Sequence, residues 1–269
     1  SSLLGRRAGV VSGAALLVDY VLTITVSIAA AGDALFSMLP VGWHGFKLPM
    51  EVVWVIGLTT INIRGVKESI IMLMPVFILF LLTHAVLIGF GIFGHGPELP
   101  SMFGNLHAEY RAGLSTLGAI GMFRLFLHAY SLGGGTYTGI EAVSNGLSIM
   151  REPRVQTAKR TMIYMATSLA LTAGGLTLCY LLSHVSMEEG KTMNAVLVER
   201  VAGKWPLGSV FIFLTLISEG ALLVVGAQAG FVDGPRIMAN MALDGWFPRR
   251  FSSLSERLTT QDGIVLMGA

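Results

Sequence analysis

Charged residues are scarce in this sequence of 269 residues. Aspartate, glutamate, lysine and arginine together make up 13% of it, whereas soluble proteins average about 25%. Hydrophobic residues make up 53%, and the mean hydropathy is +0.70. So few charged side chains could not cover a soluble surface, and the composition therefore indicates a polytopic membrane protein. The net charge of +2 gives no reason to expect nucleic acid as a partner.

Cysteine is nearly absent too. The one cysteine, Cys179, lies inside an apolar run, which excludes a disulfide framework and a cysteine-rich metal site. No pair of histidines or acids has metal-ligand spacing, and the glycine run lacks the GK[ST] of a phosphate-binding loop. The sequence also offers no nucleophile and base for catalysis. We therefore expect neither enzyme activity nor a cofactor.

Long apolar runs, in contrast, recur along the whole chain. A helix needs about 20 apolar residues to cross about 30 Å of hydrocarbon. Six runs approach or exceed this length, and another begins after Asp262, which suggests a piece of a longer chain. We expect an all-α polytopic membrane protein with a single transmembrane domain, whose spans lie near Ala8–Leu39, Leu48–Ile63, Ser69–Phe93, Gly113–Met150, Ala158–His184 and Pro206–Val232.

Lysines and arginines alternate between the two sides of these spans. Twelve flank the spans on one side and five on the other, while Arg124 lies within a span. Because cytoplasmic loops carry the excess of Lys and Arg, the richer side is predicted to be cytoplasmic, and the chain to begin there. The twelve are Arg6, Arg7, Arg64, Lys67, Arg151, Arg154, Lys159, Arg160, Arg236, Arg249, Arg250 and Arg257.

The fourth run is too long for one straight span. About 37 helical residues would extend about 55 Å, and its middle reads SLGGGTYTGIEAVSNG. Each interior glycine costs a helix about 1 kcal/mol relative to alanine. We therefore predict two half-helices with a break at residues 133–137, the second half beginning near Thr136–Thr138 and carrying Glu141 in or just after its first turn. The alternative is that the glycines only permit close helix packing.

A broken helix at membrane depth survives only against protein or a wet cavity. Its free carbonyls and N–H groups then point into the protein, as in the midplane sites of many secondary transporters. Carbonyls and hydroxyls suit a dehydrated cation, while N–H groups suit a carboxylate. We therefore expect a small solute or cation to bind at Ser131, Gly133, Gly134, Gly135, Tyr137, Thr138 and Glu141.

Several acidic residues fall inside predicted spans, where a charge is costly and usually functional. Asp19 on the first span is the partner that we predict for Glu141, and Thr23 follows one helical turn later on the same face. This pair suits a monovalent cation or a proton relay, although Asp19 could also be a buried acid satisfied by hydroxyls. Glu219 is a further candidate for proton coupling or for a structural hydrogen bond. Asp33, nearer the external end, is predicted to be solvated.

Three motifs resemble those of one transporter superfamily. GGGTYTGIEAVSNG followed by REPR resembles the sixth helix of the amino acid–polyamine–organocation (APC) permeases. FVDGPRIMANMALDGWFPRRF resembles their signature at the end of helix eight, and INIRGVKES their turn between helices four and five. The resemblance implies a partial inverted-repeat (LeuT/APC-like) transporter fold with a broken helix, of which this chain covers helices three to eight.

The sequence is also similar to the bacterial potassium–proton symporters of that superfamily. These place an aspartate and a threonine on helix three, matched by Asp19 and Thr23, and hydroxyls and a glutamate on helix six, matched by Thr138 and Glu141. Tyr137 is bulkier than the small hydroxyl residue that the resemblance predicts.

The resemblance implies proton-coupled uptake of a monovalent cation such as potassium across a bacterial inner membrane. The partners would be the lipid bilayer, the solute and the coupling proton, with an oligomer possible. The alternatives are a proton- or sodium-coupled amino acid permease and a membrane structural or sensor protein.

Overall fold

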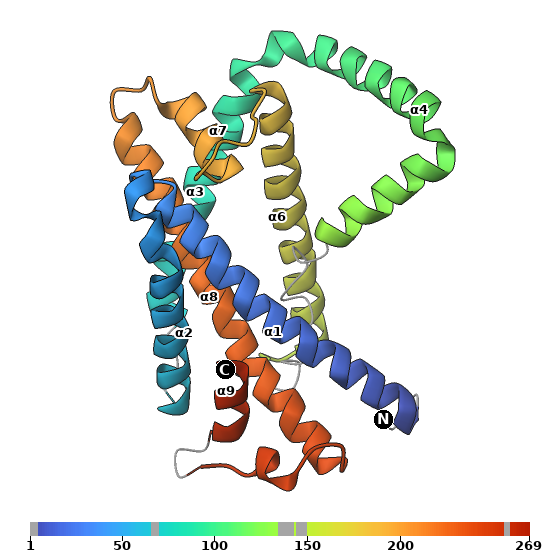
Figure 1. Cartoon of the computed structure of the whole chain (residues 1–269), viewed down its shortest axis with the longest axis vertical. Coiled ribbons are helices and arrows are strands. Elements are labelled where there is room, and N and C mark those ends of the chain that lie inside the picture. The colour runs from blue at the N-terminus through green and yellow to red at the C-terminus, as the bar shows by residue number, and fades with distance from the viewer. Residues whose placement is uncertain (1–4, 66–69, 134–142, 144–149, 256–258) are drawn as a thin grey trace. The chain divides into compact units, whose positions relative to one another are not determined.

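The computed structural model describes residues 5–65, 70–133, 143, 150–255 and 259–269. Helices are the only regular secondary structure in these ranges (Figure 1). The α-helices are α1 (Arg6–Phe36), α2 (Lys47–Ile63), α3 (Ile70–Gly94), α4 (Leu99–Gly133), α6 (Arg154–Leu182), α7 (Met193–Ala202), α8 (Gly208–Leu243) and α9 (Gln261–Met267). The 3-10 turns are η1 (Val41–Phe46), η2 (Gly96–Glu98) and η5 (Arg249–Ser252).

Six helical segments in the described ranges are long and apolar enough to cross a membrane. Each overlaps one of the six runs predicted from the sequence, and the all-α polytopic fold is confirmed. The segments are Arg6–Phe36, Val41–Ile63, Met74–Gly94, Gly96–Gly133, Arg154–Leu182 and Gly208–Leu243.

Helix α8 is longer than the predicted span because it continues past the apolar run to Leu243. Its last three turns carry Asp233 and Arg236, whose carboxylate and guanidinium lie 3.5 Å apart. Pro235 lies inside the helix without ending it. A polar extension of this kind is compatible with a helix that emerges from the hydrocarbon, since it no longer needs an apolar surface.

Helix α4 differs from the predicted fourth span at its beginning. It starts at Leu99, and Gly118 interrupts it with a φ of 68° and a ψ of 171°. Glycine adopts this backbone conformation without the Cβ clash that other residues meet. The helix ends at Gly133, the first glycine of the run. The predicted second half-helix falls mainly on residues 134–142 and 144–149, which lie outside the described residues, and the break remains a prediction.

The chain divides into two compact units, each described by itself. The first unit contains residues 1–81, 189–192 and 213–269, and the second contains residues 82–188 and 193–212. In the first unit, side chains of α1, α8 and α9 pack together in a buried core. The core side chains are Tyr20, Ile24, Phe231, Met238, Ala242, Phe251, Ile264 and Met267.

Glycines on α8 bring its backbone close to α1. A Cβ placed on Gly230 would lie 2.6 Å from Cγ1 of Ile24 and 2.8 Å from the carbonyl oxygen of Tyr20. A Cβ placed on Gly220 would lie 3.1 Å from Cγ of Leu35. Position numbers rise along α1 as they fall along α8, so the two helices are antiparallel, and small residues at the crossing permit the close approach.

The second unit is organised around α7, a helix of ten residues between two spans. Five successive residues of α7 are buried, beginning with Asn194. The side-chain nitrogen of Asn194 lies 3.2 Å from Nε2 of His84 on α3, whose imidazole is buried. Arg200 on the exposed face donates to the carbonyl oxygens of Ser183 and His184, which follow α6. The helix is therefore anchored at both ends.

Candidate functional site

The Asp19–Thr23 pair predicted to bind a cation lies in the middle of α1. Thr23 is buried, with 7% of its surface exposed, on the same face as Tyr20 and Ile24. Asp19 is exposed among the described residues and has an interaction with the rest of the chain. Four residues of helix rise about 6 Å, which brings the carboxylate and the hydroxyl onto neighbouring turns of one face.

The hydroxyl residues of α1 lie near two glycines of α8. Ser27 follows Thr23 one turn later, and its hydroxyl lies 3.6 Å from a Cβ placed on Gly226. Thr23 lies between the levels at which Gly230 meets Tyr20 and Gly226 meets Ser27. The two glycines of α8 thus approach α1 closely on either side of Thr23, and we call this contact the seam.

Glu219, the other candidate for proton coupling, occupies a different level. Its neighbour Gly220 faces Leu35 and the carbonyl oxygen of Ala31. Asp19 precedes Leu35 by sixteen residues, which corresponds to about 24 Å of helix. The structure therefore does not bring Glu219 to Asp19. Glu219 is half-buried and has an interaction of its own.

The remaining predicted site residues belong to the second unit. Ser131 is exposed and Gly133 is half-buried in the last turn of α4. The other five lie outside the described residues, namely Gly134, Gly135, Tyr137, Thr138 and Glu141. Their participation in binding stays a prediction. In the described part of the chain, three or more His, Cys, Asp or Glu side chains nowhere gather as they would around a metal ion.

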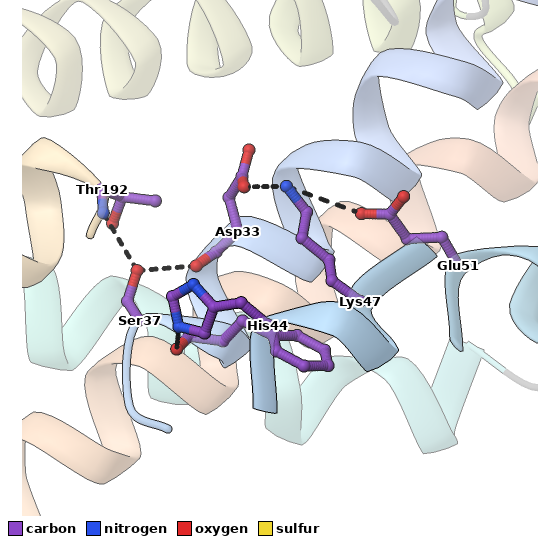
Figure 2. A network of polar contacts seen from close by, with 7 residues as sticks. Asp33, Ser37, His44, Lys47, Glu51 and Thr192 are labelled. Carbon is purple, nitrogen blue, oxygen red and sulfur yellow. Dashed lines mark hydrogen bonds and ion pairs between the residues drawn. The ribbon is translucent and has the colours of Figure 1, made fainter. Parts of the chain in front are cut away.

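A second polar group lies at the far end of α1, where the sequence interpretation expected a solvated Asp33. Figure 2 shows the ammonium of Lys47 between the carboxylates of Asp33 and Glu51. Lys47 pairs with Asp33 and lies 3.8 Å from Oε1 of Glu51. We call this group the outer cluster; it consists of Asp33, Ser37, His44, Lys47, Glu51 and Thr192.

Hydrogen bonds connect the outer cluster to three segments of the chain. The hydroxyl of Ser37 donates to the carbonyl of Asp33 at 2.6 Å and accepts from the backbone N–H of Thr192 at 2.9 Å. Nε2 of His44 lies 3.1 Å from the carbonyl oxygen of Phe36 (Figure 2). The end of α1, the start of α2 and the loop at residues 189–192 are therefore joined.

Glu51 is the most buried acid of the outer cluster. Its side chain is 13% exposed, and it packs so tightly on Gly32 of α1 that a Cβ there would collide with the carboxylate. The side chain of Asp33 is 52% exposed, so the predicted solvation of Asp33 is confirmed, but its pairing with Lys47 was missed. Lys47 and Glu51 are four residues apart on one helix, a spacing that could have suggested their interaction.

A cavity of about 340 Å³ opens beside the outer cluster. Its lining includes Asp33, His44 and Lys47, together with Lys191 and Thr192 from the loop. The two lysines and one aspartate give this cavity a slight excess of positive charge. The cavity therefore does not resemble a site for a cation, which would need an excess of carboxylate or carbonyl oxygens.

These features define a class of protein. Six apolar helices and polar side chains between closely packed spans are typical of solute carriers. The sequence matches the amino acid permease family over residues 1–268, and the chain belongs to this family, a member of the APC superfamily. It is therefore a multi-pass membrane protein, as the resemblance of its motifs predicted.

A particular relative is the potassium transporter KimA of Bacillus subtilis (strain 168). The two are 31% identical over 268 residues, which cover 98% of this chain and 42% of the relative. The chain thus spans less than half the length of that protein. The similarity to potassium transporters within the superfamily, suggested by the motifs, is confirmed.

Proposed function

We propose that the protein takes up a monovalent cation, potassium in particular, together with a proton. The observation that carries this proposal is the similarity over nearly the whole chain to a protein named as a potassium transporter. The Asp19–Thr23 pair supports it, because a carboxylate and a hydroxyl on neighbouring turns supply oxygen ligands to a dehydrated cation. The proposal includes a bacterial inner membrane and a cytoplasmic start of the chain, supported by the excess of Lys and Arg on that side.

The residues that we propose to bind the cation are those predicted from the sequence. Asp19 and Glu141 would supply the negative charge, and Thr23 and Thr138 the hydroxyl oxygens. Carbonyls around Gly133–Gly135 would complete the coordination, with Ser131 and Tyr137 beside them. A cation between two carboxylates favours their ionised forms, so that cation binding and the protonation state of these acids are linked.

Glu219 would have a separate task in this scheme. It lies about 24 Å along the helix axis from the level of Asp19, too far to share a bound cation with it. A half-buried acid within a span exchanges protons only where water reaches it. We therefore assign Glu219 to proton transfer towards the outer side and not to cation coordination.

Uptake measurements test the proposal. The complete protein would be expressed in bacteria lacking other potassium uptake systems, and growth at low potassium and rubidium uptake would be measured. Asp19→Asn and Glu141→Gln should abolish uptake while the amount of protein in the membrane stays the same. Uptake that persists in both variants would exclude these acids from the mechanism.

A matched pair of threonines sharpens this test. Thr23→Val removes the buried hydroxyl with little change of volume and should weaken rubidium uptake about tenfold. Thr25→Val is the control, because Thr25 lies on an exposed face of the same helix and donates only to carbonyls of that helix, those of Val21 and Leu22. Equal effects of the two substitutions would assign the loss to α1 stability and not to binding.

The family description favours a second candidate function, the transport of an amino acid. Such a cargo would place its carboxylate on the N–H groups of the predicted second half-helix. An anionic Glu141 nearby would oppose this arrangement. Uptake of labelled amino acids by the same cells distinguishes the two, since a potassium carrier would accumulate rubidium and leave the amino acids outside.

A further inference from the structure

An apolar groove of about 270 Å³ lies on the first unit. It is formed by α1, α8, the turn after α8, and α9, and every side chain that lines it is hydrophobic. The lining includes Val18, Val21 and Leu22 of α1, Met238 of α8, Phe247 after α8, and Leu266 of α9.

One wall of the groove is open. Val18 is 59% exposed, Leu22 is 54% exposed and Leu266 is 51% exposed, whereas Met238 at the floor is fully buried. Because Val18, Leu22 and Met238 lie on membrane spans, an acyl chain of the bilayer is the apolar group that fits against them. The groove thus fits a flexible apolar ligand better than a polar one.

The turn after α8 connects this groove to a group of arginines. Gly245, with a φ of 82°, ends the helix; its N–H donates to Ala242, and the N–H of Trp246 donates to Met241. This is the hydrogen-bond pattern of a Schellman motif. The reversal of the chain places Trp246 next to the groove-lining Phe247.

The arginines stand at the aromatic end of the groove. The guanidinium of Arg6 lies 5.0 Å from the centre of the Trp246 ring, and that of Arg250 lies 5.2 Å from the ring of Phe251. Arg7 and Arg249, their neighbours in the sequence, are exposed. We call these four the basic rim; Asp262 lies 3.8 Å from Arg250, and Asp244 precedes Trp246 by two residues.

We propose that this groove and rim bind one anionic phospholipid of the cytoplasmic leaflet. An acyl chain lies in the groove, the phosphate meets Arg6 and Arg250, and Trp246 lies at the level of the headgroup. The basic rim has an excess of two positive charges over its acids, which complements an anionic headgroup and gives a zwitterionic one no such advantage. Tryptophan is the aromatic residue typical of the membrane interface. A symmetric contact with a second copy would bring two basic rims together and is opposed by their repulsion.

This site is independent of the proposed transport activity, because it shares none of its binding residues. The experiment uses native mass spectrometry of the complete protein, released from bilayers with equal amounts of phosphatidylglycerol and phosphatidylethanolamine. We expect phosphatidylglycerol to be retained in clear preference to phosphatidylethanolamine. Each basic side chain near an anionic lipid strengthens binding about fivefold, so Arg6→Gln and Arg250→Gln should each reduce retention about fivefold. Arg154→Gln is the control, since Arg154 is also exposed and is predicted on the same side of the membrane.

A second pair of variants tests the groove itself. Val18→Trp fills the groove from its open side and should abolish retention, whereas Val26→Trp, at an exposed position of α1 that does not line the groove, should leave it unchanged. Equal retention of the two lipids, or retention that survives Val18→Trp, would overturn the proposal. Dimers crosslinked through Val18→Cys would overturn it in favour of a contact between two copies.

Discussion

The contact between Gly230 and α1 gives a quantitative test of the packing. In Gly230→Ala, the new Cβ would lie 2.6 Å from Cγ1 of Ile24 and 2.8 Å from the carbonyl oxygen of Tyr20. The side chain could shift a little, but the carbonyl belongs to helix backbone, so α1 itself has to move. Overpacking of this kind costs about 1–3 kcal/mol, and the better helix propensity of alanine returns about 1 kcal/mol.

Taking the middle of the overpacking range, about 2 kcal/mol, the expected net destabilisation is about 1 kcal/mol, which lowers the unfolding temperature by about 2–4 °C at this chain length. The assay heats the detergent-solubilised protein and measures the fraction that remains monodisperse by size-exclusion chromatography. Gly57→Ala is the matched control, because Gly57 lies inside α2 and a Cβ there meets no atom within 4 Å. It should be neutral or slightly stabilising.

Rubidium uptake provides a second measurement on the same pair of variants. A shift of α1 at Tyr20 also displaces Thr23 and Asp19, so Gly230→Ala should reduce rubidium uptake while Gly57→Ala preserves it. If Gly230→Ala were as stable as the wild type and as active, the close approach of α1 and α8 would be refuted, and with it the geometry of the seam.

Three further predictions concern polar contacts. Asn62 and Gln228 exchange two side-chain hydrogen bonds of 2.9 and 2.8 Å, so Asn62→Leu or Gln228→Leu alone should destabilise the protein by about 1–3 kcal/mol. In thermal unfolding, the double variant should be closer to the wild type than either single variant is. Additive losses of stability would contradict the pairing. Lys47→Met removes the positive charge between Asp33 and Glu51 and should lower the free energy of unfolding by about 1 kcal/mol. Adding Glu51→Gln should partly restore the stability in the same assay. His84→Leu removes the contact with Asn194 and should accelerate hydrogen exchange in α7 but not in α2, whereas unchanged exchange would show that this contact does not stabilise α7.

The all-α polytopic fold could be predicted from the sequence because a membrane imposes a simple rule of length and hydropathy on each helix. The sequence also predicted the relation of Asp19 to Thr23, since residues four apart on a helix share a face whatever surrounds them. A buried imidazole within an apolar run needs a hydrogen-bond partner, and His84 of α3 has one in Asn194. The identity of that partner, 110 residues away, could not follow from a local pattern.

Other features depend on tertiary packing and could not be predicted from the sequence. The outer cluster joins segments around Asp33, Lys47 and Thr192, and only the fold brings them together. Gly118 gave no local signal distinguishing it from the other glycines of its run, yet it alone there has a positive φ among the described residues. Glu219 and Asp19 are both acids inside apolar runs, but the antiparallel packing of α1 and α8 places them at different heights along these two helices.

Helix α7 has a practical consequence for mapping the topology of this protein. Between Asn194 and Val198 the chain is as inaccessible as the middle of a span, although it connects two spans on the same side of the membrane. Thiol reagents applied to cysteines introduced there should report protection, which would be mistaken for an additional membrane crossing. The exposed Lys191 and Lys204 on either side of the helix are the positions from which labels and tags would report the true sidedness of this loop.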